Sequence, residues 1–71
     1  MEYNYDKLKG RIREKFGTQG GFAKVIGIGQ STLNLKLNNN AEWTQEEMIA
    51  AMVALDEDES RISEYFFAHD V

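Results

Sequence analysis

Apolar residues recur at intervals of three and four along the first part of the chain. Tyr5, Leu8, Ile12 and Phe16 follow the 3.6-residue repeat of a helix with one buried face. This stripe predicts a first helix from about Tyr5 to Phe16. Asn4 or Asp6 is placed to cap its start, and Gly17 is expected to end it.

The same spacing continues on both sides of a glycine pair. Phe22 and Ile26 lie four residues apart with Val25 beside them, and Leu33 and Leu37 repeat this interval. Between the two pairs, Gly27 is suited to the left-handed conformation that ends a helix and turns the chain sharply. We therefore predict a helix over about 19–26, with Thr18 as its cap, a turn, and a helix over about 30–37.

The second half of the chain opens with a capping box, in which Thr44 and Glu47 satisfy each other's free backbone donors. Trp43 is expected to pack on the helix that follows. That helix carries a broad apolar face that should close the core, made of Met48, Ile49, Met52, Val53 and Leu55. The acidic stretch 56–60 is interpreted as a linker ending in a cap.

A dense apolar cluster follows this linker, and it predicts a fifth short helix. Its members are Ile62, Tyr65, Phe66 and Phe67. Some must be core, and Tyr65, Phe66 and Phe67 are the candidates for a dimer or partner surface. The expected fold class is all-α, a compact bundle of four or five helices that forms a single domain over 1–71 and contains a helix-turn-helix at about 19–38. At this length a single core is only marginally stable, so dimerisation or partner binding would help.

Composition supports this view, because the chain has no proline and no cysteine. Without a long apolar run or a signal segment, it is expected to be soluble and intracellular. The net charge is −4, but residues 1–40 hold seven Lys or Arg against three Asp or Glu, whereas residues 41–71 hold one against nine. The balances of +4 and −8 predict a basic face that binds phosphate and an acidic face turned away from it. Two alternatives stay open: both halves are ordinary solvated surface, or the acidic half meets a basic protein partner.

Catalytic chemistry is not indicated by these residue types. His69 is the single histidine, there is no thiol nucleophile, and no glycine-rich phosphate loop is present. We expect no enzyme activity, no metal site, no cofactor and no membrane association.

The helix over about 30–37 carries side chains suited to reading DNA bases. Gln30 can donate and accept at once, as adenine requires in the major groove, and Ser31 and Thr32 offer short hydroxyls. Asn34 and Leu35 lie one turn further and extend the contact by hydrogen bonds and by apolar contact. Phosphate contacts are expected from Lys24, Lys36 and the amides of Asn38 and Asn39.

Residues 19–37 resemble the helix-turn-helix of the lambda-repressor-like family, which includes the Cro and repressor proteins of temperate phages. The matching positions are Gln19, Ala23, Gly27, Ile28, Gln30, Ser31 and Leu33. In that family the residues matching Gln30, Ser31 and Asn34 face the groove, and those matching Gln19 and Asn38 grip the backbone. The chain departs from the family at Lys36, where an apolar residue is usual, and Leu37 is the natural substitute.

This resemblance implies a Cro-like transcriptional regulator of a phage lysis–lysogeny switch. Such a protein binds double-stranded operator DNA in the cytoplasm of a bacterial host, normally as a homodimer on a two-fold site. An outward Leu35 and the acidic second half fit this function poorly. They keep open an alternative, an antirepressor or modulator of the same fold that binds the phage repressor protein.

Overall fold

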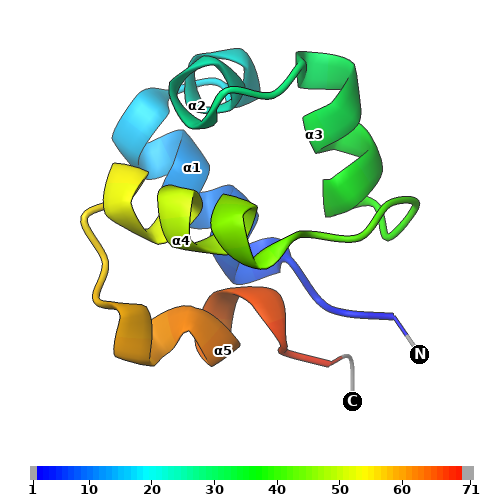
Figure 1. Cartoon of the computed structure of the whole chain (residues 1–71), viewed down its shortest axis with the longest axis vertical. Coiled ribbons are helices and arrows are strands. Elements are labelled where there is room, and N and C mark those ends of the chain that lie inside the picture. Colours follow the sequence, from blue (N-terminus) through cyan, green and yellow to red (C-terminus); the bar gives the residue numbers. More distant parts are fainter. Residues whose placement is uncertain (1, 70–71) are drawn as a thin grey trace.

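In a computed structural model, residues 2–69 are described and form an all-helical bundle (Figure 1). Residues 1, 70 and 71 of the domain predicted over 1–71 lie outside the described residues. The helices are α1 (Asp6–Phe16), α2 (Gln19–Ile26), α3 (Gln30–Leu37), α4 (Gln45–Ala54), the 3₁₀ turn η1 (Glu59–Arg61) and α5 (Ile62–Phe66). In this view α2 and α3 lie at the top, α4 in the middle and α5 at the bottom.

The predicted helix ends are confirmed between α1 and α3. Gly17 follows α1 with φ 78°, and the Thr18 hydroxyl accepts a hydrogen bond from the backbone N–H of Gly21 at 3.2 Å. Gly27 ends α2 in the left-handed conformation, with φ 81° and ψ 28°. A side chain is strained at such a positive φ, so this glycine fixes the direction in which α3 leaves the turn.

The second half also begins as expected, because Thr44 and Glu47 form both hydrogen bonds of a capping box. The predicted apolar face of α4 is only partly buried. Met52 is fully buried, whereas the side chains of Ile49 and Val53 are exposed, which corrects the prediction that both close the core. A helix of this length that lies on the surface turns only one side to the core.

One core joins all the helices. Its buried members are Tyr5, Leu8, Ile12, Phe22, Ala23, Leu33, Leu37, Trp43, Ala51, Met52, Leu55, Tyr65 and Phe66. Trp43 is buried in this core, with its ring centroid 4.9 Å from that of Phe66 of α5 in an edge-to-face arrangement. Val25, which the sequence pattern groups with Phe22 and Ile26, is mostly exposed.

The first and last described residues lie side by side (Figure 1). Tyr3 forms an antiparallel bridge with His69, and the N–H of Asn4 donates to the carbonyl of Ala68 at 2.7 Å. The sequence pattern gave no sign of this pairing. Within residues 2–69, no helix is long and apolar enough to cross a membrane.

Candidate functional site

The outward surface of α3 consists of Gln30, Ser31, Thr32, Asn34 and Leu35. All five side chains are exposed, because Leu33, Lys36 and Leu37 take the inward positions of this helix. The residues predicted to contact bases are therefore brought together on one accessible surface. Exposure is what any contact requires, and it does not distinguish DNA from protein.

Gln19 and Lys24, two residues expected to contact the DNA backbone, lie on α2. Gln19 is half-buried at the start of α2. Next to it, a Cβ added to Gly20 would lie 3.2 Å from the side-chain oxygen of Gln30. The amide of Gln30 therefore lies close against the first turn of α2, an approach that favours glycine at position 20. Lys24 is exposed on the last turn of α2 and remains available for a phosphate.

Lys36 does not reach the surface, and the prediction that it contacts a phosphate is wrong. Its side chain is 6 % exposed, and its ammonium lies 2.9 Å from the Glu47 carboxylate and donates to the backbone carbonyl of Glu42 at 2.6 Å. It also lies 5.8 Å from the centre of the Trp43 ring. Partial burial raises the pKa of Glu47, but the N–H of Thr44 and the ammonium of Lys36 lower it further, so the net shift is downward. The inward charge is thus paired with another charge.

The asparagines after α3 form hydrogen bonds within the molecule. The amide of Asn39 is engaged inside the molecule, donating to the carbonyl of Tyr3 at 2.9 Å and accepting from the N–H of Tyr3 at 3.0 Å. These two hydrogen bonds hold the amide against the N-terminal segment, and its contact with a phosphate stays a prediction. Asn38 is exposed, and its amide donates to the backbone carbonyl of Asn34 at 2.8 Å.

Three of the five cations of α1 pair with carboxylates of the acidic second half of the chain, which reduces the predicted basic face of this helix. The ion pairs across this surface are Lys7–Glu64, Arg11–Glu57 and Lys15–Asp56. Arg61, the one cation of the second half, pairs with Glu57 and Glu64. Within the described residues, only Lys9, Arg13 and Lys24 lack an acidic partner, and none of them lies on α3.

Of the three aromatic residues expected at a partner surface, two belong to the core. Tyr65 is 2 % and Phe66 1 % exposed, so the prediction is wrong for both, whereas Phe67 is 43 % exposed. The Tyr65 hydroxyl donates to the Glu57 carboxylate at 2.6 Å. Burial, followed by this hydrogen bond, raises the pKa of Tyr65.

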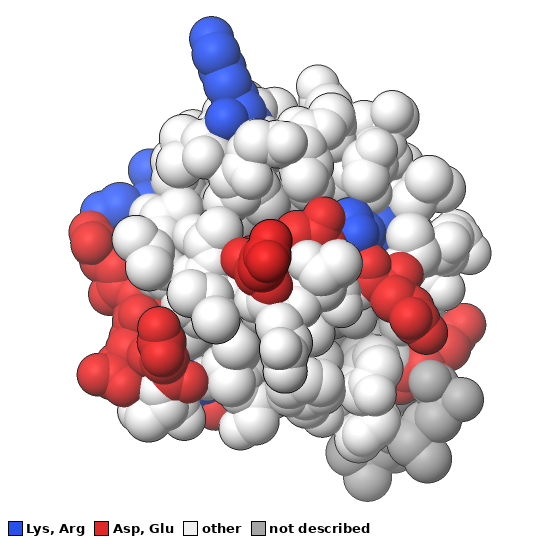
Figure 2. Space-filling model, in the orientation of Figure 1, with Lys and Arg blue, Asp and Glu red and all other residues white. Residues whose placement is uncertain are grey.

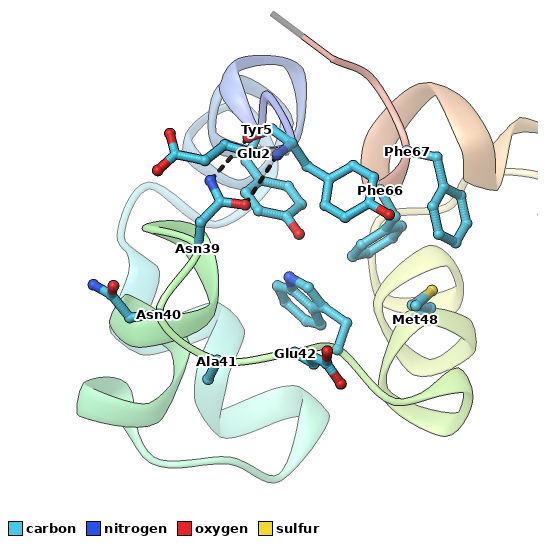
Figure 3. Close-up of a pocket in the computed structure, with 11 residues that line it drawn as sticks. Glu2, Tyr5, Asn39, Asn40, Ala41, Glu42, Met48, Phe66 and Phe67 are labelled. Carbon is cyan, nitrogen blue, oxygen red and sulfur yellow. Dashed lines mark hydrogen bonds between the residues drawn. The ribbon is translucent and has the colours of Figure 1, made fainter.

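A hollow of about 440 Å³ lies between the N-terminal segment, the α3–α4 loop and the end of α5 (Figure 3). We call it the aromatic pocket; its lining residues include Tyr3, Tyr5, Trp43, Phe66 and Phe67. Sequence reasoning missed it. No spacing in the sequence connects residues 3, 43 and 67, which meet only through tertiary packing.

Comparison with known proteins places this geometry in a family. The model of a family of proteins of unknown function, DUF739, matches residues 1–69. The chain belongs to this family. It is also similar to a solved structure, the modulator of repression (MOR) of the temperate bacteriophage TP901-1 from Lactococcus lactis. That match has 40 % sequence identity and a TM-score of 0.80, and it covers 94 % of this chain and 90 % of the other.

No curated protein matches the chain. The all-helical bundle agrees with the solved relative. Membership of the lambda-repressor-like family stays a prediction that rests on the helix order and on residues 19–37.

Proposed function

We propose that this protein modulates repression in a temperate phage by binding the phage's repressor protein. The relative that is 40 % identical over nearly the whole chain is a phage modulator of repression. This relationship favours the alternative raised by the sequence over direct operator binding.

The observation that carries the proposal is the chemistry of the outward surface of α3. It contains no charged side chain, and Leu35 is 48 % exposed within it. The single cation of α3, Lys36, is buried. Figure 2 shows this side of the molecule, at the upper right, as largely white. Charge depletion around an exposed apolar residue is typical of the centre of a protein–protein interface.

Electrostatics support the same conclusion. Affinity for DNA comes largely from cations that neutralise phosphates. The single cation of α3 is paired with a carboxylate, and so are three of the five cations of α1. The two others, Lys9 and Arg13, do not lie on α3. A repressor must itself present a basic surface to its operator. An acidic chain of net charge −4 is attracted to that surface, which raises the rate of association.

The test uses the repressor and the operator DNA of the same phage. We expect the purified chain to bind the repressor in a calorimetric titration and to change its occupancy of labelled operator. Leu35→Ala should weaken repressor binding about tenfold or more, as loss of a central apolar contact does.

The matched control is Val53→Ala, which also shortens an exposed aliphatic side chain but lies on α4. Its repressor affinity should stay within about twofold of the wild type. Absence of repressor binding, or equal effects of both variants, would refute the proposal.

Operator binding of the Cro type is the second candidate, and a specific observation favours it. Gln30, Ser31 and Asn34, the positions that face the groove in the family that residues 19–37 resemble, are all exposed. Among residues 2–69, only Lys9, Arg13 and Lys24 lack an acidic partner. If these three make the phosphate contacts of a subunit, the log–log salt slope should be no steeper than about −2.7 per subunit.

This candidate also predicts that Gln30→Ala relaxes the preference at one base position. Tight binding to operator DNA in the absence of repressor, with that change in preference, would select it over the first proposal.

A further inference from the structure

The aromatic pocket lies apart from the outward surface of α3 and needs its own explanation. We propose that it takes an arginine side chain of the protein partner. This inference deepens the proposed function, since it assigns a second contact to the same basic partner. The occupant is identified from the rings, the charges and the rigidity of the pocket.

The pocket is lined by aromatic rings, and one of them, Tyr3, also lies 4.9 Å from the ring of His69. Tyr3 and Phe67 meet edge to face with their centroids 5.9 Å apart, and Phe67 is the most accessible of the lining aromatic residues. A guanidinium group stacks on such faces and is more weakly hydrated than an ammonium group. The molecule already uses this chemistry next to the pocket, where the ammonium of Lys36 lies over the ring of Trp43.

The charges of the pocket select a cation. Its only charged lining residues are Glu2 and Glu42, both exposed, and the described residues offer neither carboxylate an ion-pair partner. In Figure 3 they occupy different sides of the rim. The backbone carbonyl of Glu42 is engaged by Lys36, but its carboxylate is not. These acids repel an anionic occupant, whereas a guanidinium group with five donors can pair with them.

The wall of the pocket is held in place before any ligand arrives. Asn39, at φ 62°, forms two hydrogen bonds with the backbone of Tyr3, shown as dashed lines in Figure 3. The N–H of Asn4 donates to the carbonyl of Ala68. These bonds fix Tyr3 beside Phe67. A preformed wall reduces the ordering cost of binding.

The experiment uses the full chain and a small probe, N-acetyl-arginine amide, with N-acetyl-citrulline amide as the uncharged analogue of the same shape. Trp43 is the single tryptophan, so its fluorescence and its indole N–H resonance report on the pocket directly. We expect saturable changes with the arginine probe and at least tenfold weaker binding of the citrulline probe. Equal responses to the two probes, or no saturable response, would overturn the proposal.

Variants test the contribution of each wall. Glu42→Gln should weaken the arginine probe about two- to fivefold, and its matched control Glu46→Gln, an exposed carboxylate outside the pocket, should not change it. Phe67→Leu keeps an apolar side chain but removes the ring, and a loss of about two- to fivefold is expected. Equal effects of Glu42→Gln and Glu46→Gln would count against a specific site.

The probe titration contains no repressor, so the two proposals fail separately. A chain that binds repressor but not the arginine probe overturns the pocket assignment and leaves the proposed function standing. A chain that binds the probe but not the repressor refutes the proposed function and supports the guanidinium preference of the pocket.

Discussion

Two surfaces of the molecule differ in their charged side chains. One is the surface where α1 meets residues 56–64, and the other is the outward surface of α3. On the first, Lys7 and Lys15 each pair with a carboxylate of the second half of the chain. On the second, the five exposed side chains are uncharged, and the one lysine of α3 is turned inward to Glu47. The difference shows that most cations of the first half have a carboxylate partner within the molecule.

This contrast changes the meaning of the charge distribution along the sequence. Separate basic and acidic halves suggested separate basic and acidic faces. In the structure the acidic half packs against α1 and pairs with three of its five cations, for example Arg11 with Glu57 and Lys7 with Glu64. What remains exposed on α3 is suited to a partner that is recognised by shape and apolar contact.

The largest expected effect concerns the inward lysine. Lys36→Ala removes the cation that pairs with the Glu47 carboxylate and donates to the Glu42 carbonyl, so the free energy of unfolding should fall by about 3 kcal/mol. Urea denaturation measures it. Lys24→Ala removes an exposed, unpaired lysine and should change stability by less than about 0.5 kcal/mol.

A double variant sharpens this comparison. Lys36→Met with Glu47→Gln replaces the buried charges by groups of similar shape and should recover most of the loss, because an apolar replacement of a buried pair is often neutral. If Lys36→Ala and Lys24→Ala were equally mild, Lys36 would be an ordinary surface residue, and the contrast between the two surfaces would disappear.

Two glycines should give effects of intermediate size and of opposite sign to each other, Gly27 at the end of α2 and Gly10 within α1. Gly27→Ala places a side chain at φ 81° with no other atom within 4 Å, so backbone strain alone should cost about 1–2 kcal/mol. Gly10→Ala lies within α1, also in open space, and should stabilise by about 1 kcal/mol. Thermal unfolding of both variants checks this. A lower melting temperature for both variants would contradict the open space around position 10.

The smallest effect is the acid response of the exposed ion pairs. Hydrogen bonds from Arg61 and then Lys7 lower the pKa of Glu64 from 4.5 to about 2. Because the folded pKa lies below the unfolded one, this stabilisation is complete above about pH 4.5 and is lost as the pH falls towards 2.

Glu64→Gln should therefore flatten the fall of the melting temperature between pH 4.5 and pH 2. Glu46→Gln, which removes a carboxylate without an ion pair among the described residues, serves as the control and should keep the wild-type slope. Identical slopes for wild type and Glu64→Gln would show that the pairs on this surface do not contribute.

Much of the fold was predictable because it is encoded locally. The glycine at position 27, the cap at Thr18 and the capping box at Thr44 act within four residues of the helix ends that they define. The apolar stripe of α1 likewise selects Leu8 and Ile12 for the core. Such signals need no knowledge of tertiary contacts.

The candidate site was less predictable, because partners distant in sequence determine it. In the lambda-repressor-like family, which residues 19–37 resemble, an apolar residue is usual at position 36, so an inward side chain is expected there. Only the tertiary contact with Glu47 shows how a lysine is accommodated at this position. Asn39 was expected to contact phosphate, yet it binds the backbone of Tyr3, 36 residues earlier. The aromatic pocket depends on this long-range contact and was not foreseen at all.

The pairing of residues 3–4 with residues 68–69 also bears on the order in which the molecule assembles. The α2–turn–α3 unit is joined by contacts between residues close in sequence, such as the hydrogen bonds from the N–H groups of Gly27 and Ile28 to the carbonyl of Ala23. The wall of the aromatic pocket closes only when Asn4 meets Ala68, a contact between residues 64 positions apart. The two surfaces proposed to meet the partner therefore differ in contact order: local contacts build the first, and a contact between the two ends of the chain completes the second.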